Sequence, residues 1–376
     1  MIYLDHAATA PPDPRVLEAM LPHLGERFGN PSEPHAAGRM ARADLEAARE
    51  EIARLVGCET AEVVLTGGGT EADNLAVLGR AQGIPGRLVI SALEHPAVRG
   101  TAEALAVRGW RVEIAPVLTN GCLDLNALDA SVRSGDALVC VLGASNLTGV
   151  LQPIAEVAVL CAERGVPLHV DHVQTASGAP IDLSSLPGVV TAAIAAHKLG
   201  GPRGVGALVG RGIRSLAPIS FGGGQEAGLR PGTENVAGAV ALAAALSIRQ
   251  GPDAVAERAT RAALRDQLEE RLGLPVAGGV AERLPGHTLL LTGLRGDTVV
   301  RLLDERGIAV AAGSACASGE TAPDATLTAM GIAAAQARSA VRVTLGPTTT
   351  QSDIDAFVTA WSELEPALRA AAEAAA

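Results

Sequence analysis

Seven short apolar segments, which alternate with helical patterns, constrain the fold of this 376-residue chain more than any other feature. Helical segments such as TEADNLAVLGRA (70–81) and PIAEVAVLCAERG (153–165) separate several of them. Strands that alternate with helices predict a mainly parallel sheet with right-handed crossovers, and hence an α/β fold. The seven predicted strands are residues 62–66, 87–92, 111–117, 137–143, 167–172, 189–198 and 204–210.

The pattern changes after an Ala-rich helix, which we expect to run from Asn235 to about Ile248 and to end at the sequence GPD. Two further helical patterns, the apolar segments HTLLLTGL and VRVTLG and a terminal helix follow. Together they have the size and composition of a compact α+β domain. We therefore predict a large domain over residues 15–250 and a small domain over 1–14 and 251–376.

Composition excludes several classes of function. The chain carries 41 acidic against 30 basic residues, a net charge of −11, which argues against a general nucleic-acid binder. With three Phe, two Trp and one Tyr, it cannot form a platform for stacking bases. The five cysteines show no CxxC pair or zinc-ligand spacing, and neither a signal peptide nor a membrane-spanning run is evident. These features predict a reduced, soluble, cytoplasmic protein.

Lys198 is the only lysine, since every other basic residue counted above is arginine. Arginine can replace lysine on a surface, but its guanidinium stays protonated and cannot attack a carbonyl. A single lysine in such a chain is therefore a candidate for amine chemistry, above all a Schiff base. The alternative is an ordinary surface lysine.

Two further features suggest a bound phosphate and a bound cation. The sequence TGGGTEADN (66–74) places three glycines and Thr70 at a strand-to-helix turn, where backbone N–H groups can bind phosphate. Asp171 ends a predicted buried strand, where a carboxylate needs a cation or a strong donor, such as a protonated pyridine nitrogen. A capped glycine turn and a surface or helix-capping aspartate are the alternatives.

The order of these features along the chain is the order needed to hold pyridoxal 5'-phosphate. The glycine turn would anchor the phosphate, Asp171 would keep the ring an electron sink, and Lys198 would form the imine. Cys316, in the small-residue segment GSACASG, is a candidate nucleophile on a mobile loop. Arg342, in the apolar strand VRVTLG, suggests a bidentate carboxylate partner or a structural ion pair.

Almost from end to end, the sequence resembles the cysteine desulfurases of the NifS/IscS-like branch, within the class V aminotransferases and the fold-type-I pyridoxal phosphate enzymes. The resemblance is carried by YLDHAAT, TGGGTEADN, EHPAV, SNLTGV, VDHVQ, HK, GGGQEAGLRPGTENVAG, GSACASG and VRVTLG. It implies a homodimer that takes sulfur from L-cysteine, releasing L-alanine and leaving a persulfide for transfer to an acceptor protein.

The resemblance also implies roles for individual residues. Lys198 would hold the cofactor and shuttle a proton, His95 would stack on the ring and transfer a proton, and Cys316 would accept the sulfur. Arg342 and Asn146 would bind the substrate carboxylate. The other cofactor contacts would be Gly69, Thr70, Asn146, Asp171, Gln174, His197 and Thr233, the last reaching across from the neighbouring subunit.

Two positions depart from the family pattern. Ala195 stands where the family usually has a phosphate-binding Ser or Thr, so one phosphate hydrogen bond is absent or comes from water or Thr66. His172 follows Asp171 where a small residue is usual, and it would alter cofactor packing or act as a further acid–base group. The alternatives to a desulfurase are a selenocysteine lyase, another pyridoxal phosphate-dependent β-lyase, and a sulfur-relay subunit that depends on a partner.

Overall fold

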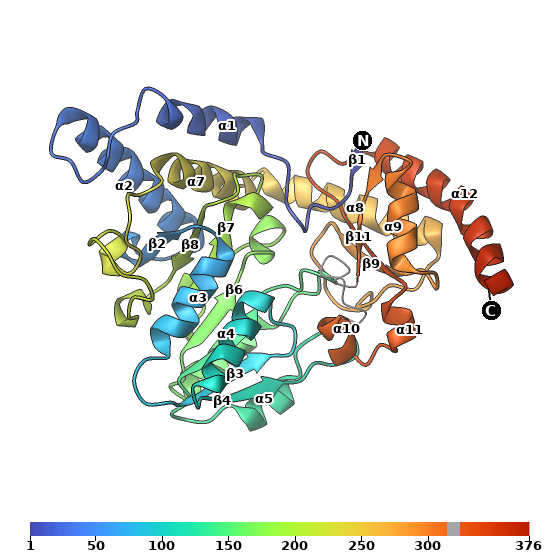
Figure 1. Cartoon of the computed structure of the whole chain (residues 1–376), viewed down its shortest axis with the longest axis horizontal. Helices are drawn as coiled ribbons and strands as arrows, with labels where there is room; N and C mark the ends of the chain where they lie inside the picture. The colour runs from blue at the N-terminus through green and yellow to red at the C-terminus, as the bar shows by residue number, and fades with distance from the viewer. Residues whose placement is uncertain (314–323, 376) are drawn as a thin grey trace.

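A seven-stranded sheet forms the centre of the larger part of the molecule in the computed structural model, which describes residues 1–313 and 324–375 (Figure 1). The strand order is β2-β8-β7-β6-β5-β3-β4. All seven predicted strands are confirmed. They are β2 (Val63–Thr66), β3 (Arg87–Ser91), β4 (Arg111–Ala115), β5 (Leu138–Leu142), β6 (Leu168–Asp171), β7 (Val189–Ala195) and β8 (Gly206–Val209).

The direction of the strands brings several carboxyl ends to one edge of the sheet. Strands β4, β3, β5, β6 and β7 are parallel neighbours, whereas β8 runs antiparallel to both β7 and β2. Strand β2 therefore points the same way as β7. Strands β5 and β6 are buried along their whole length, because helices cover both faces of a parallel sheet.

Helices pack on the two faces of this sheet (Figure 1). Helices α2 (Ala36–Val56), α6 (Ile154–Glu163) and α7 (Val236–Gln250) share one apolar core with residues of the sheet, including Leu168 and Val170 of β6. Helices α3 (Gly69–Arg80) and α4 (Pro96–Val107) pack elsewhere on the sheet. Because side chains alternate along a strand, His169 and Asp171 of β6 point away from that first core.

A second unit carries a three-stranded antiparallel sheet in the order β11-β12-β9. Its elements are α8 (Ala254–Leu272), β9 (His287–Leu291), α9 (Gly296–Asp304), β10 (Ile308–Ala309), β11 (Ala311–Ala312), α10 (Ala325–Ala329), α11 (Ala334–Ala337), β12 (Ala340–Thr344) and α12 (Gln351–Ala375). The N-terminal β1 (Ile2–Tyr3) pairs with β10, and Leu4 belongs to the core of this unit. Among the described residues, no helix is both long and apolar enough to cross a membrane.

We propose that the domains divide at residues 14/15 and 250/251. The support is that α7 belongs to the core of the seven-stranded sheet, whereas Leu264 and Leu268 of α8 belong to the core of the second unit. Helix α1 (Pro14–Met20) packs against α7, which supports placing the first division at the start of this helix.

Candidate active site

The carboxyl ends of the strands enclose a cavity of about 240 Å³. Strand β3 leads to His95, β5 to Asn146, β6 to Asp171 and β7 to Lys198. This is the edge at which open α/β sheets bind ligands. The predicted site residues that line the cavity are Gly69, Thr70, His95, Asn146, Asp171, Gln174, His197 and Lys198.

The amine of Lys198 is held by the N-terminal segment. Its Nζ donates to the carbonyl oxygens of Ala7, at 2.5 Å, and Ala8, at 2.8 Å. Burial and, to a lesser extent, the charge of Arg342 lower the Lys198 pKa to about 8. The amine is therefore uncharged in an appreciable fraction of molecules near neutral pH, and this is the form that attacks a carbonyl.

A pair of carboxyl groups forms the floor of the cavity. Asp171 and Asp73 are both buried, and burial raises the pKa of Asp171 to about 7 and that of Asp73 to about 8. His169 Nε2 lies 3.1 Å from Asp73 Oδ1, and its Nδ1 lies 2.9 Å from the Thr191 hydroxyl. Two carboxyl groups buried in this way favour a cationic ligand group in the cavity. Asp73 was not predicted, although its place one turn into the helix after the glycine turn was a usable signal.

His95 lies close to these carboxyl groups. One polar atom from each of Asp73, His95 and Asp171 lies within 4.8 Å of the other two. His95 is the N-cap of α4, and its Nδ1 accepts from the N–H of Ala97, so the neutral ring carries its proton on Nε2. Burial, followed by the charge of Lys198, lowers the His95 pKa and keeps the ring neutral.

The glycine turn closes the end of the cavity at the start of α3. Gly68 has a φ of +149°, and a Cβ on Gly69 would lie 2.5 Å from Val173 Cγ2, so this tight turn requires glycine. The first N–H groups of α3 have no partner within the helix and are free to bind an anion. Gly69, Thr70 and His197 also line an adjoining cavity of about 710 Å³ together with Arg203. Burial, followed by the charges of Lys198 and Arg203, lowers the His197 pKa to about 4.

Arg342 and Asn146 lie together at the junction of the two units. The Arg342 guanidinium donates to the backbone oxygen of Asn146 at 3.0 Å and to the Asp5 carboxylate at 2.7 Å. A planar guanidinium in such a setting binds carboxylates in pairs of hydrogen bonds. An ion pair was one of the two expectations for Arg342, and its partner in this structure is Asp5, which the sequence did not identify.

The remaining predicted residues have different outcomes. Thr233 is exposed and lines neither cavity. Cys316 lies outside the described residues. Gln174 is buried, and its side-chain amide donates to the Ala7 carbonyl at 2.9 Å, so it shares its acceptor with Lys198.

The two departures from the family pattern have structural consequences. The Thr66 hydroxyl donates to the Gly68 carbonyl at 3.0 Å, so Thr66 is not free to replace the donor that is missing at Ala195.

His172 does not line the cofactor-sized cavity. It lines a separate cavity of about 760 Å³ with Gly143 and Thr175, because it follows Asp171 and points to the other side. This location argues against His172 packing on the cofactor ring or acting as an acid or base in the cavity that Lys198 lines.

Comparison with known proteins assigns the family. The family model for class-V aminotransferases matches residues 2–357. The chain belongs to this family. It is 40% identical over 373 residues to an IscS-like cysteine desulfurase of Mycobacterium tuberculosis, covering 95% of this chain and 94% of that protein.

Solved structures of similar proteins have the same fold. A NifS-like protein superposes with a TM-score of 0.90 at 31% identity, covering 98% of this chain and 99% of the other. The structure described as SspA in complex with cysteine superposes with a TM-score of 0.81 at 29% identity, covering 93% and 100%. The mainly parallel sheet with a smaller second unit is thus the class-V fold.

The class-V family implies pyridoxal phosphate, and the residues present fit it. A buried carboxyl group with a raised pKa suits the pyridinium nitrogen, an amine with a lowered pKa suits the aldehyde, and the glycine turn suits the phosphate. The described cavity therefore offers a complementary group for each end of the cofactor.

Proposed function

We infer that this chain is a pyridoxal phosphate-dependent cysteine desulfurase, which converts L-cysteine into L-alanine and a protein-bound persulfide. The observation that carries the inference is the arrangement of Lys198, Asp171 and His95 around one cavity, in a chain 40% identical to an IscS-like cysteine desulfurase over nearly its full length.

Each end of the cofactor would have its own partner. Lys198 would bind the aldehyde carbon, Asp171 would pair with the ring nitrogen, and the N–H groups after Gly68, with Thr70 and His197, would bind the phosphate. Gln174 keeps one side-chain N–H for the phenolic oxygen, since the other donates to Ala7. When bound, pyridoxal phosphate accepts the electrons released as an amino acid loses its Cα proton.

The chain's own residues would then move protons and orient the substrate. Lys198, with a pKa of about 8, can both take and return a proton near neutral pH. His95 would cover the ring and offer its Nε2–H to the reacting groups. Arg342 and Asn146 would bind the substrate carboxylate, which would compete with Asp5 for the guanidinium.

Cys316 would receive the sulfur. Its thiolate would form an S–S bond with the substrate sulfur as the Cβ–S bond breaks, and the electron pair of that bond would stay with the carbon skeleton. Proton uptake then gives alanine and leaves a persulfide on Cys316, so atoms and electrons balance without an external oxidant.

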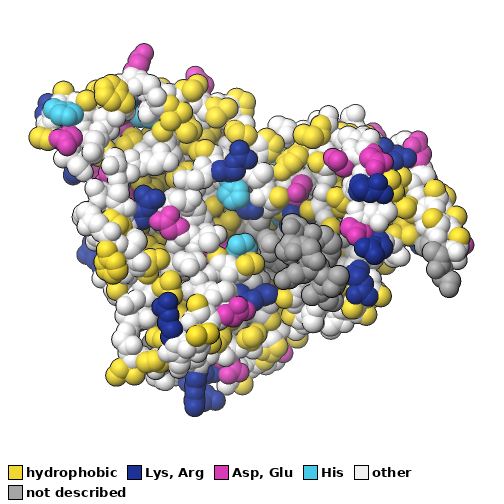
Figure 2. Space-filling model, in the orientation of Figure 1, with side chains coloured by type: hydrophobic (Ala, Val, Ile, Leu, Met, Phe, Trp, Pro, Cys, Tyr) yellow, Lys and Arg dark blue, Asp and Glu magenta, His cyan; other side chains and the backbone are white. Residues whose placement is uncertain are grey.

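The site would be completed by a second copy of the chain. Thr233 is too exposed to bind phosphate in its own subunit, as a residue that acts across an interface would be. Two of the three phenylalanines are also exposed, Phe28 by 79% and Phe221 by 87%. Figure 2 shows hydrophobic side chains on the surface over α1 and α2. Leu21 and Leu24, in the short helix between α1 and α2, are each 63% exposed. Exposed apolar surface of this kind is typical of interfaces.

For the sulfur-acceptor protein, we propose only the charge of its docking surface. A net charge of −11 favours an acceptor protein with a basic docking surface.

The function is tested with purified protein that has been loaded with pyridoxal phosphate. L-cysteine and a thiol reductant should give sulfide and alanine in equal amounts, and omission of the reductant should leave a persulfide on the peptide that contains Cys316. A Cys316→Ser variant should retain the cofactor absorbance and lose sulfide production. If wild-type protein holds the cofactor but releases no alanine from cysteine, the proposal is wrong.

A further inference from the structure

The turn that carries Lys198 is fixed by contacts on both sides of the lysine. Ala10 N–H donates to the His197 carbonyl at 2.7 Å, and Asp13 N–H donates to the Gly200 carbonyl at 2.8 Å. The carbonyl between them, that of Leu199, accepts from Arg249 Nε at 3.0 Å. A side chain of α7 thus holds the carbonyl group of the residue that directly follows the lysine.

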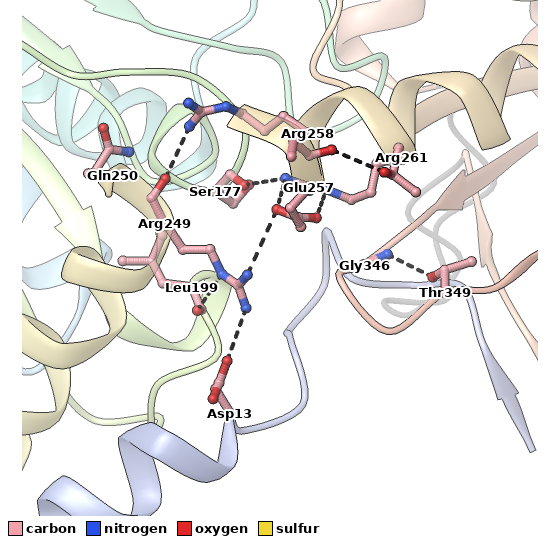
Figure 3. Close-up of polar contacts among 12 residues, drawn as sticks. Asp13, Ser177, Leu199, Arg249, Gln250, Glu257, Arg258, Arg261, Gly346 and Thr349 are labelled. Atoms are coloured by element: carbon pink, nitrogen blue, oxygen red, sulfur yellow. Dashed lines mark hydrogen bonds and ion pairs between the residues drawn. The ribbon is translucent and has the colours of Figure 1, made fainter. Parts of the chain in front are cut away.

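Arg249 joins three segments that are distant in sequence (Figure 3). Its guanidinium contacts Leu199 O, lies 3.7 Å from the Asp13 carboxylate and lies 3.9 Å from the carboxylate of Glu257 on α8. The residue is only 8% exposed. A buried guanidinium is stable only with such partners, and a lysine ammonium cannot reproduce its planar set of donors.

Glu257 extends the same network to the turn that carries Gln174, which also lines the cavity. Arg261, also buried, donates to Glu257 at 3.1 Å and to the Ser177 carbonyl at 3.0 Å. Ser177 ends the short helix Thr175–Ser177, which directly follows Gln174. Gln250 supports the same turn, since its amide donates to the Ala176 carbonyl at 2.9 Å.

We propose that Arg249, Glu257 and Arg261 form a positioning network that fixes the Lys198 turn and the Gln174 turn relative to each other. None of the three lines the cavity. They act through the backbone: Arg249 orients the lysine, and Arg261 orients the turn whose glutamine shares the Ala7 carbonyl with that lysine. The start of α8, the first helix of the second unit, is thereby connected to both walls of the site. The inference rests on the proposed function.

The test compares Arg249→Ala, Arg249→Lys and Glu257→Gln with wild-type protein, all purified without cofactor and titrated with pyridoxal phosphate. Loss of one hydrogen bond from a charged donor corresponds to about a tenfold change in binding. We expect each variant to bind the cofactor about tenfold more weakly and to shift the pH midpoint of the bound cofactor's absorbance. Glu257→Gln is the mildest change and provides a folded variant if Arg249→Ala does not fold.

Arg283→Lys is the matched control. The Arg283 side chain is as buried as that of Arg249 and pairs with Glu269 at 2.7 and 2.9 Å, but its hydrogen bonds reach neither the Lys198 turn nor the Gln174 turn. The Arg283→Lys substitution should lower the melting temperature without changing the cofactor dissociation constant or the pH midpoint of the absorbance. Arg249 and Glu257 variants that lose stability yet keep wild-type values of both quantities would overturn the network. Failure of the wild-type protein to bind the cofactor would instead overturn the proposed function.

Discussion

The lowered pKa of Lys198 can be tested through the rate at which the cofactor attaches to the empty protein. With a pKa of about 8, half of the amines are uncharged at pH 8, whereas an ordinary lysine with a pKa of 10.5 is about 0.3% uncharged there. Burial is the main cause of this difference, and Arg342 adds to it. The structure therefore predicts an attachment rate at pH 8 about 150-fold above that of an unperturbed lysine.

The assay mixes cofactor-free protein with pyridoxal phosphate from pH 6 to pH 10 and follows attachment by absorbance, with borohydride trapping of the Lys198 peptide as confirmation. The rate should rise about tenfold per pH unit below pH 7 and become constant above about pH 9. Arg342→Met should move the midpoint to higher pH, because a positive neighbour is lost, and Lys198→Arg should show no attachment. A rate that still rises tenfold between pH 9 and pH 10 would refute the argument.

Three other changes test the site and its surroundings. Because burial raises the Asp171 pKa to about 7, its stabilising contribution to the empty protein is complete below pH 4 and is lost as the pH rises through 7. The melting temperature should therefore fall from pH 5 to pH 8, by less with the cofactor bound and by less in Asp171→Asn. Ala195→Ser should restore a phosphate donor and tighten cofactor binding by about three- to tenfold in equilibrium titrations, and an unchanged dissociation constant would show that no donor is missing. Phe221→Asp should convert a dimer to a monomer in light-scattering measurements. A dimer that persists would show that Phe221 lies outside the interface.

The seven-stranded sheet could be predicted because most of its strands are buried on both faces and so read as continuous apolar runs, although the edge strand β4 is largely exposed. The segment ALVCVLG becomes β5 and VVTAAIAAHK leads through β7 to Lys198, as expected. The antiparallel direction of β8 had no local signal, since direction depends on the connection and not on the residues of the strand. Helix α2 was not predicted, although buried residues such as Ala41, Leu45 and Ala48 recur at helical spacing.

The site was predictable to the extent that its chemistry lies in side chains. Lysine, aspartate and histidine at strand ends can be read from the sequence, and they line one cavity. The carbonyl groups of Ala7 and Ala8 that hold Lys198 could not be found, because every residue has a carbonyl and only tertiary structure selects one. Arg249 could not be found for the same reason, because nothing in the sequence distinguishes it among the 29 arginines as the residue that binds the Leu199 carbonyl.

The N-terminal segment has a consequence for how the protein matures on the ribosome. Residues 2–13 are synthesised first, yet β1 pairs with β10, and Ala7 N–H donates to the Thr344 hydroxyl at 2.9 Å. A nascent chain can complete the seven-stranded sheet once residue 209 has emerged, and Ala10 and Asp13 can then bind the Lys198 turn. The contacts of β1 and Ala7 with the second unit need residues up to 344. The N-terminal segment that holds the Lys198 amine is therefore fully anchored only late in translation, after the seven-stranded sheet has formed.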